Sequence, residues 1–166
     1  MPDISFAKKH ELSIVQQLAQ AIWPVVYKDI ITEEQIVYML DAFYQLPVLE
    51  AQFDEGQQFI IVRRGQEPIA FAAYGKVDSS DNTVTYKLHK IYVLPTQHGA
   101  GVGREMIEWI ITEIKMEDAS ALKLNVNKNN PAIHFYKKLN FVISRQEIID
   151  IGNDFVMDDY VMTRIL

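Results

Sequence analysis

Residues 85–115 read TYKLHKIYVLPTQHGAGVGREMIEWIITEIK, and this stretch decides the fold. Residues 85–93 have the composition of a β-strand, which a proline soon ends. Residues 104–115 carry apolar side chains at helical spacing. Glycines alternate from position 99 to position 103 between these segments, so the sequence predicts a strand, a glycine-rich turn and a helix in direct succession.

The glycine-rich turn suits a phosphate or a pyrophosphate. Glycines before a helix leave backbone N–H groups open to a ligand, and the helix N-terminus adds partial positive charge. A tight turn that binds nothing is the alternative, although three glycines within five residues favour a ligand site. Two nucleotide motifs are excluded by spacing. Gly103 is followed by Arg104 and Glu105, unlike a P-loop, and neither Gly99 nor Gly101 begins G-x-G-x-x-G.

Length and composition predict one globular domain over residues 1–166, with 49% hydrophobic and 23% charged residues. No apolar run approaches the roughly 20 residues of a membrane span, and no secretory pattern begins the sequence. We therefore expect a cytoplasmic protein without a membrane partner. The absence of cysteine excludes disulfides, thiolate nucleophiles and Cys-based metal sites.

The net charge of −6 argues against nucleic acid as a partner. Acidic residues are concentrated between positions 24 and 62, where Lys28 is the single basic residue. They are Asp29, Glu33, Glu34, Asp41, Glu50, Asp54 and Glu55. Two interpretations stay open: solvated helix faces, or a surface that attracts cationic substrates.

The remaining sequence predicts a mixed sheet with helices packed on it. Thr32 and Gln35 form a capping-box pattern, Pro24 is expected to end or bend the first helix, and residues 78–82 predict a turn. The expected strands are 4–8, 59–62, 69–74, 85–93, 121–127, 141–150 and 155–165, and the expected helices are 12–22, 32–44, 104–115 and 132–139. The fold class is therefore α/β, with a mixed β-sheet.

Two segments together resemble the GCN5-related N-acetyltransferase superfamily. Residues 92–103, YVLPTQHGAGVG, match that family's acyl-CoA pyrophosphate loop, Q/R-x-x-G-x-G/A. Residues 129–141, NNPAIHFYKKLNF, match its N-x-x-A-x-x-x-Y-x-K-x-G-F segment. The order of elements agrees over nearly the whole chain. The sequence departs at His98, where Gln or Arg is usual, and at Asn140, where Gly is usual.

The resemblance implies acetyl-CoA as the cosubstrate. Main-chain groups of Ile91 and Val93 would pair with its pantetheine arm, which enters between splayed parallel strands as an added strand would. Asn129 would contact the arm, and the Tyr136 hydroxyl would point at the thioester sulfur. The pyrophosphate would be held by main-chain groups of the loop, at the cofactor-binding residues His98, Gly99, Gly101, Val102, Gly103 and Arg104.

The resemblance also implies that an amine attacks the thioester directly, without an acyl-enzyme. The Val93 N–H is then the candidate oxyanion donor, and Tyr136 the candidate acid, although spacing alone makes Tyr136 a core aromatic. Lys87 occupies the position of the family's usual glutamate base. His89 is therefore the candidate base, with a hydrogen-bonded strand histidine as the alternative. No metal site is expected.

The acceptor is expected to be a primary amine, either a small cationic amine such as a polyamine or a peptide amine. Tyr27 and Tyr38 are the candidate wall residues of its pocket. A non-catalytic acyl-CoA-binding sensor is the alternative function. The apolar segment 155–162 predicts either a homodimer interface or an ordinary strand.

Overall fold

The structure is a computed structural model that describes residues 2–77 and 81–166. Its strands are β1 (Asp3–Phe6), β2 (Gln58–Arg64), β3 (Glu67–Val77), β4 (Thr85–Val93), β5 (Ala121–Asn127), β6 (Val142–Gly152) and β7 (Phe155–Ile165). Its helices are α1 (Leu12–Val26), α2 (Glu33–Phe43), α3 (Leu46–Asp54), α4 (Val102–Lys115) and α5 (Ala132–Lys138), with 3-10 turns at Lys9–Glu11 and Pro95–Gln97.

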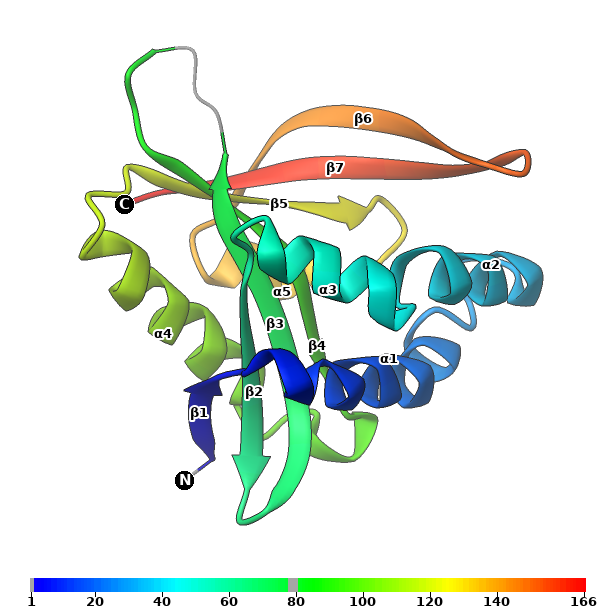
Figure 1. Ribbon diagram of the computed structural model, residues 1–166. Helices are drawn as coiled ribbons and strands as arrows, with labels where there is room; N and C mark the ends of the chain where they lie inside the picture. Colours follow the sequence, from blue (N-terminus) through cyan, green and yellow to red (C-terminus); the bar gives the residue numbers. More distant parts are fainter. Residues whose placement is uncertain (1, 78–80) are drawn as a thin grey trace. The chain divides into compact units, whose positions relative to one another are not determined.

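Among the described residues, seven strands form one mixed sheet in the order β1-β2-β3-β4-β5-β7-β6 (Figure 1). The predicted α/β fold class with a mixed sheet is confirmed. The chain divides into two compact units, Met1–Gly75 with Lys90–Ile107, and Lys76–His89 with Glu108–Leu166. Strand β4 and helix α4 each run from one unit into the other.

The first unit is built on the antiparallel strands β1, β2 and β3. Ile4 pairs with Val62, and Ile61 pairs with Phe71. Strands β2 and β3 and helices α1 and α3 supply large, fully buried side chains to its core. The largest are Phe59, Phe71, Leu12, Ile22, Leu49, Ile60, Ile61 and Ile69.

The helices of this unit differ in part from the prediction. Pro24 was expected to end or bend the first helix; it does not end the helix, since α1 continues to Val26 and closes its last turn with the Tyr27 N–H on the Trp23 carbonyl. Helix α3 was not predicted, because it lacks a pronounced apolar stripe. The predicted cap of α2 is confirmed, since Thr32 Oγ1 accepts a hydrogen bond of 3.1 Å from the Gln35 N–H.

The second unit contains the start of β4 together with β5, β7 and β6. Strands β6 and β7 form a long hairpin (Figure 1) whose two-residue turn, Asn153 and Asp154, has positive φ at both positions. The Asn130 side chain caps the start of α5 by accepting from the Ala132 N–H, and Asn140 adopts the expected positive φ of 67° after the helix.

In the predicted turn at 78–82, residues 78–80 lie outside the described residues. Within residues 2–77 and 81–166, no helix combines the length and the apolar character needed to cross a membrane.

A stability prediction follows from Glu11, whose carboxylate accepts from the Lys8 N–H at 2.9 Å and from Arg63 at 2.6 Å. The backbone hydrogen bond from Lys8 is the main cause that lowers the pKa of Glu11, with Arg63 adding to it. A lowered pKa stabilises the folded state above the unfolded value of about 4.3, and this is lost as the pH falls through the folded-state pKa. We expect Glu11→Gln to lower the free energy of unfolding by about 1 kcal/mol at pH 7.

Urea unfolding at pH 7 and pH 3 measures this effect, with Glu67→Gln, at an exposed position, as the control. The difference in the free energy of unfolding between wild type and Glu11→Gln should be smaller at pH 3 than at pH 7. An equal difference at the two pH values would contradict the stabilising role of the ionised Glu11 carboxylate.

Candidate active site

The predicted phosphate loop lies in the first unit, between the 3-10 turn Pro95–Gln97 and helix α4. Gly99 and Gly101 have φ values of +81° and +82°, in the left-handed region that favours glycine. The first helical hydrogen bond of α4 runs from the Glu105 N–H to the Gly101 carbonyl at 3.0 Å. The N–H groups just before Glu105 therefore have no carbonyl to bind within the helix, which leaves them for an anion.

The His98 side chain closes this loop onto the end of β4. Its Nε2 lies 2.9 Å from the Val93 carbonyl oxygen, and because a carbonyl only accepts, Nε2 is the donor in this contact. Gln97, the residue before it, accepts from Arg64 Nε at 3.2 Å. Sequence reasoning assigned His98 only a main-chain role, so this side-chain contact was missed. Arg104 and Val102 lie in the first turn of α4 with Gly103.

The parallel pairing between β4 and β5 is short. It joins Thr85–Leu88 to Ala121–Leu124 and ends there, although β4 continues to Val93 and β5 to Asn127. The predicted splaying of these strands requires such an early end. His89 directly follows the last paired residue of β4 and is half-buried. The roles of His89, Ile91 and the Val93 N–H stay predictions.

Tyr136 and Asn129 lie in the second unit. Tyr136 is 8% exposed, and its ring packs against Phe135 and Phe141 with centroid distances of 5.3 and 5.8 Å. The ring is thus packed as a core aromatic, and its role as an acid stays a prediction. Asn129 is exposed, and its N–H donates to the Asn127 side chain at 2.9 Å.

Tyr27 belongs to an aromatic cluster in the first unit. Its hydroxyl lies 2.8 Å from that of Tyr92, the residue before Val93, and its ring lies 4.5 Å from that of Trp23. Sequence reasoning did not select Tyr92 as a site residue, although Tyr92 directly precedes Val93, the candidate oxyanion donor. Tyr38 is half-buried on α2. The wall roles of Tyr27 and Tyr38 stay predictions.

Sequence reasoning missed a set of polar side chains on one face of the second unit's strands. Lys87 is paired with Lys123, Asn125 with Val161, and Glu147 with Asp159, and directly paired residues share a face. The opposite face of β5 carries the buried side chains of Leu122, Leu124 and Val126. The alternation of Lys123, Asn125 and Asn127 along β5 was the available signal.

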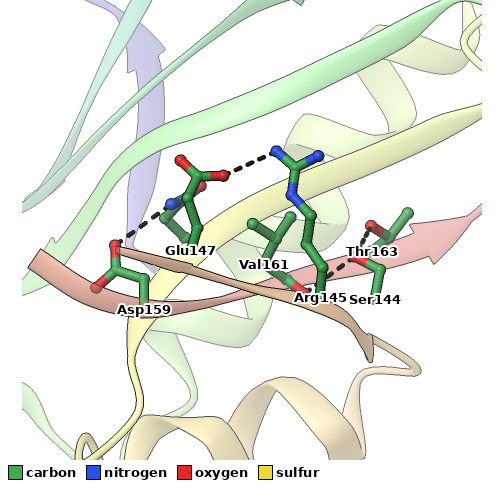
Figure 2. A network of polar contacts seen from close by, with 7 residues as sticks. Ser144, Arg145, Glu147, Asp159, Val161 and Thr163 are labelled. Atoms are coloured by element: carbon green, nitrogen blue, oxygen red, sulfur yellow. Dashed lines mark hydrogen bonds and ion pairs between the residues drawn. The ribbon is translucent and has the colours of Figure 1, made fainter. Parts of the chain in front are cut away.

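Asp159 is the most buried member of this polar face, with 4% of its surface exposed. It accepts a hydrogen bond of 3.3 Å from Asn125 Nδ2, and burial raises the pKa of its carboxyl, with the charge of Glu147 adding to the effect. Glu147 is bound by Arg145 at 2.8 Å, and Figure 2 shows these two side chains pointing toward one another. The hydrogen bond from Arg145 lowers the pKa of Glu147, and burial lowers that of Lys87.

In the part of the chain that the structure describes, no three or more His, Cys, Asp or Glu residues are grouped to hold a metal ion.

A model of the acetyltransferase (GNAT) family matches residues 15–141 of the chain. The L-amino acid N-acyltransferase MnaT of Escherichia coli (strain K12) is 24% identical over 144 residues, which cover 86% of this chain and 81% of that protein.

Solved structures show the same fold. The PaiA N-acetyltransferase from Thermoplasma acidophilum, in complex with coenzyme A, has a TM-score of 0.82 at 17% identity, with 100% of this chain and 99% of that chain covered. Arabidopsis thaliana Naa50, in complex with the bisubstrate analogue CoA-Ac-MVNAL, has a TM-score of 0.69 at 20% identity, with 98% and 97% covered.

The loop geometry predicts opposite effects for two alanine substitutions. Gly101→Ala should lower the free energy of unfolding by roughly 1 kcal/mol, because a side chain is strained at its positive φ. The space around its missing Cβ is open, so the cost comes from the backbone alone. Gly103→Ala, in the first turn of α4 without a positive φ, should be neutral or stabilising by up to about 1 kcal/mol. Urea unfolding of both variants measures these changes in the free energy of unfolding. Equal losses of stability in the two variants would contradict the loop conformation.

Proposed function

The chain belongs to the acetyltransferase (GNAT) family and is an acyltransferase, and we propose that it transfers the acetyl group of acetyl-CoA to a primary amine. The observation that carries the proposal is the loop of left-handed glycines before α4, whose first N–H groups lack helical partners. These groups suit the pyrophosphate of CoA. The early end of the β4–β5 pairing supports entry of the pantetheine arm beside β4.

In the proposed reaction the neutral amine attacks the thioester carbonyl directly. The N–C bond forms, the C–S bond breaks, the amine loses a proton and the sulfur gains one. The Val93 N–H stabilises the carbonyl oxygen, Tyr136 protonates the leaving sulfur, and His89 accepts the amine proton directly or through water. His98 and the loop through Arg104 hold the pyrophosphate, and Asn129 contacts the arm.

The acceptor class rests on the comparisons and on charge. The similar protein MnaT acts on L-amino acids, and Naa50 is bound to an analogue that joins CoA to a peptide. The acidic residues between positions 24 and 62 favour an acceptor that carries positive charge. We therefore propose a small cationic amine or a peptide amine, with Tyr27 and Tyr38 as wall residues.

A cytoplasmic location and a homodimer are further proposals. The β6–β7 hairpin carries the exposed apolar side chains of Ile148 and Val156, which a second copy would cover. Sedimentation analysis of the purified chain tests the dimer.

The reaction is tested by measuring the release of CoA from acetyl-CoA with a thiol-reactive chromophore. The acceptors offered are polyamines, amino acids and short peptides. The chain has no cysteine, so the protein itself gives no signal. Tyr136→Phe should lower kcat by about a hundredfold, because the acid is lost, and leave the KM for acetyl-CoA unchanged. Tyr86→Phe, at a half-buried tyrosine without an assigned role, is the control. Binding of acetyl-CoA without release for any amine would favour the sensor instead.

His98 gives a second kinetic prediction. His98→Ala removes the hydrogen bond of 2.9 Å to the Val93 carbonyl, which holds the start of the loop. The KM for acetyl-CoA should rise about fivefold, as expected for the loss of one hydrogen bond, while kcat changes little. His98→Gln retains an N–H donor and should have a smaller effect. A large fall in kcat with unchanged KM would assign His98 to the chemical step instead.

A further inference from the structure

The Trp23 indole N–H is a buried donor that lacks an acceptor. Trp23 lies near the end of α1 and is 4% exposed, and throughout the described ranges 2–77 and 81–166 its Nε1 finds no hydrogen-bond partner. Burial raises the pKa of Tyr44, and the Trp23 N–H opposes that rise. The N–H therefore lies near the Tyr44 hydroxyl, but without the geometry of a hydrogen bond. A buried donor of this kind lowers stability, and a ligand oxygen that accepted from it would remove the cost.

The rings around Trp23 form an aromatic cluster within the first unit, which joins α1 and the end of α2 to β4. The centroid of the Trp23 ring lies 4.5 Å from that of Tyr27, 5.6 Å from that of Tyr44 and 5.6 Å from that of Tyr92. Trp23 and Tyr44 are buried, whereas Tyr27 and Tyr92 are half-buried. The cluster therefore reaches the surface at the two tyrosines whose hydroxyls contact one another.

Tyr92 connects this aromatic cluster to the expected place of reaction. It directly precedes Val93, whose N–H is the candidate oxyanion donor. An acceptor amine that attacks a thioester beside Val93 would lie close to the rings of the cluster. A carbonyl or carboxylate oxygen next to that amine is an acceptor of the kind that the Trp23 N–H lacks. Amino acids and peptide N-termini carry such an oxygen, whereas alkylamines and polyamines do not.

A buried lysine beside the aromatic cluster favours an oxygen as well. Lys90, two residues before Tyr92 on β4, is 8% exposed, and its Nζ lies 5.9 Å from the centroid of the Tyr44 ring. This Nζ donates a hydrogen bond of 2.8 Å to the neutral amide oxygen of Gln52. A second ammonium group, such as a polyamine carries, would be repelled by Lys90, whereas a carbonyl or carboxylate oxygen would be attracted.

We propose that the aromatic cluster binds the acceptor and that the Trp23 N–H donates a hydrogen bond to the carbonyl or carboxylate oxygen next to the acceptor amine. The enzyme then selects amino acids and peptide N-termini over alkylamines and polyamines, because an acceptor without this oxygen leaves the buried N–H unpaired. The identity of the ligand as the acceptor rests on the proposed function, but its contact with Trp23 can be measured without acetyl-CoA. The alternative is that Trp23 serves only the core of the first unit.

The first test is an NMR titration that observes the indole N–H itself. The chain has two tryptophans, and Trp109→Phe, on α4 in the second unit, leaves the indole signal of Trp23 alone. This variant is titrated with L-leucinamide and, separately, with 3-methylbutylamine, which is the same amine without the carboxamide. Both titrations are made with and without CoA, which cannot donate an acetyl group. We expect L-leucinamide to move the Trp23 indole proton downfield and to slow its exchange with solvent, and 3-methylbutylamine to do neither.

The second test measures selectivity in the CoA-release assay. In the wild type, kcat/KM should be at least about tenfold higher for L-leucinamide or for L-leucine than for 3-methylbutylamine. Trp23→Phe removes the N–H and keeps an aromatic ring, so it should bring this ratio to within about threefold of one and leave the KM for acetyl-CoA unchanged. The matched control, Trp109→Phe, should retain the wild-type ratio. If Trp23→Phe does not fold, the titration of Trp109→Phe still decides, because that variant retains Trp23.

A Trp23 indole signal that responds equally to both amines, or to neither, would overturn the inference. A selectivity ratio that is unchanged in Trp23→Phe would overturn it as well. The two tests also separate the inference from the proposed function. CoA release that is as efficient with 3-methylbutylamine as with L-leucinamide and L-leucine would overturn the inference alone. A downfield shift of the Trp23 indole proton with L-leucinamide, but no CoA release with any amine, would overturn the proposed function alone.

Discussion

The early end of the hydrogen bonding between β4 and β5 is the constraint on which the account depends. Parallel strands need a crossover connection, here supplied by α4. The chain must turn from β4 into this helix within a short loop, and Gly99 and Gly101 make the turn with backbone conformations that other residues adopt at a cost. Because the pairing stops at Leu88, the rest of β4 has no hydrogen-bonding partner in β5. Its main-chain groups on that side are not used by β5.

Strand β5 has a buried apolar face and a polar face. Leu122, Leu124 and Val126 are buried on one face and contribute to the core. Asn125 lies on the other face and donates a hydrogen bond to Asp159, and burial raises the pKa of the Asp159 carboxyl.

The sequence predicted the parts of the fold that depend on local pattern. The cap at Thr32, the left-handed Asn140 and the strand-turn-helix unit around Gly101 are each encoded within a few residues, and the structure confirms them. Helix α3 was missed because its apolar stripe is weak, and α1 continues past Pro24 although a proline usually ends or bends a helix.

The alternation along β5 indicated a polar face, but the contacts across the strands could not be predicted, because they depend on cross-strand register. Asp159 meets Glu147 only through the turn at Asn153 and Asp154, and the β6–β7 pairing shifts twice along its length. A shift of one residue would move Asp159 to the other face of the sheet. The likeness to a known family identified the loop and Tyr136, but it gave no information about these strand residues.

Hydrogen–deuterium exchange of the backbone amides, with and without CoA, tests the central claim most directly. That claim is that main-chain N–H groups at the start of α4 bind the pyrophosphate. The account predicts that CoA slows exchange at residues 99–104 and leaves the amides at the Asn153–Asp154 turn unchanged. Slowed exchange confined to other segments, with residues 99–104 unaffected, would contradict it.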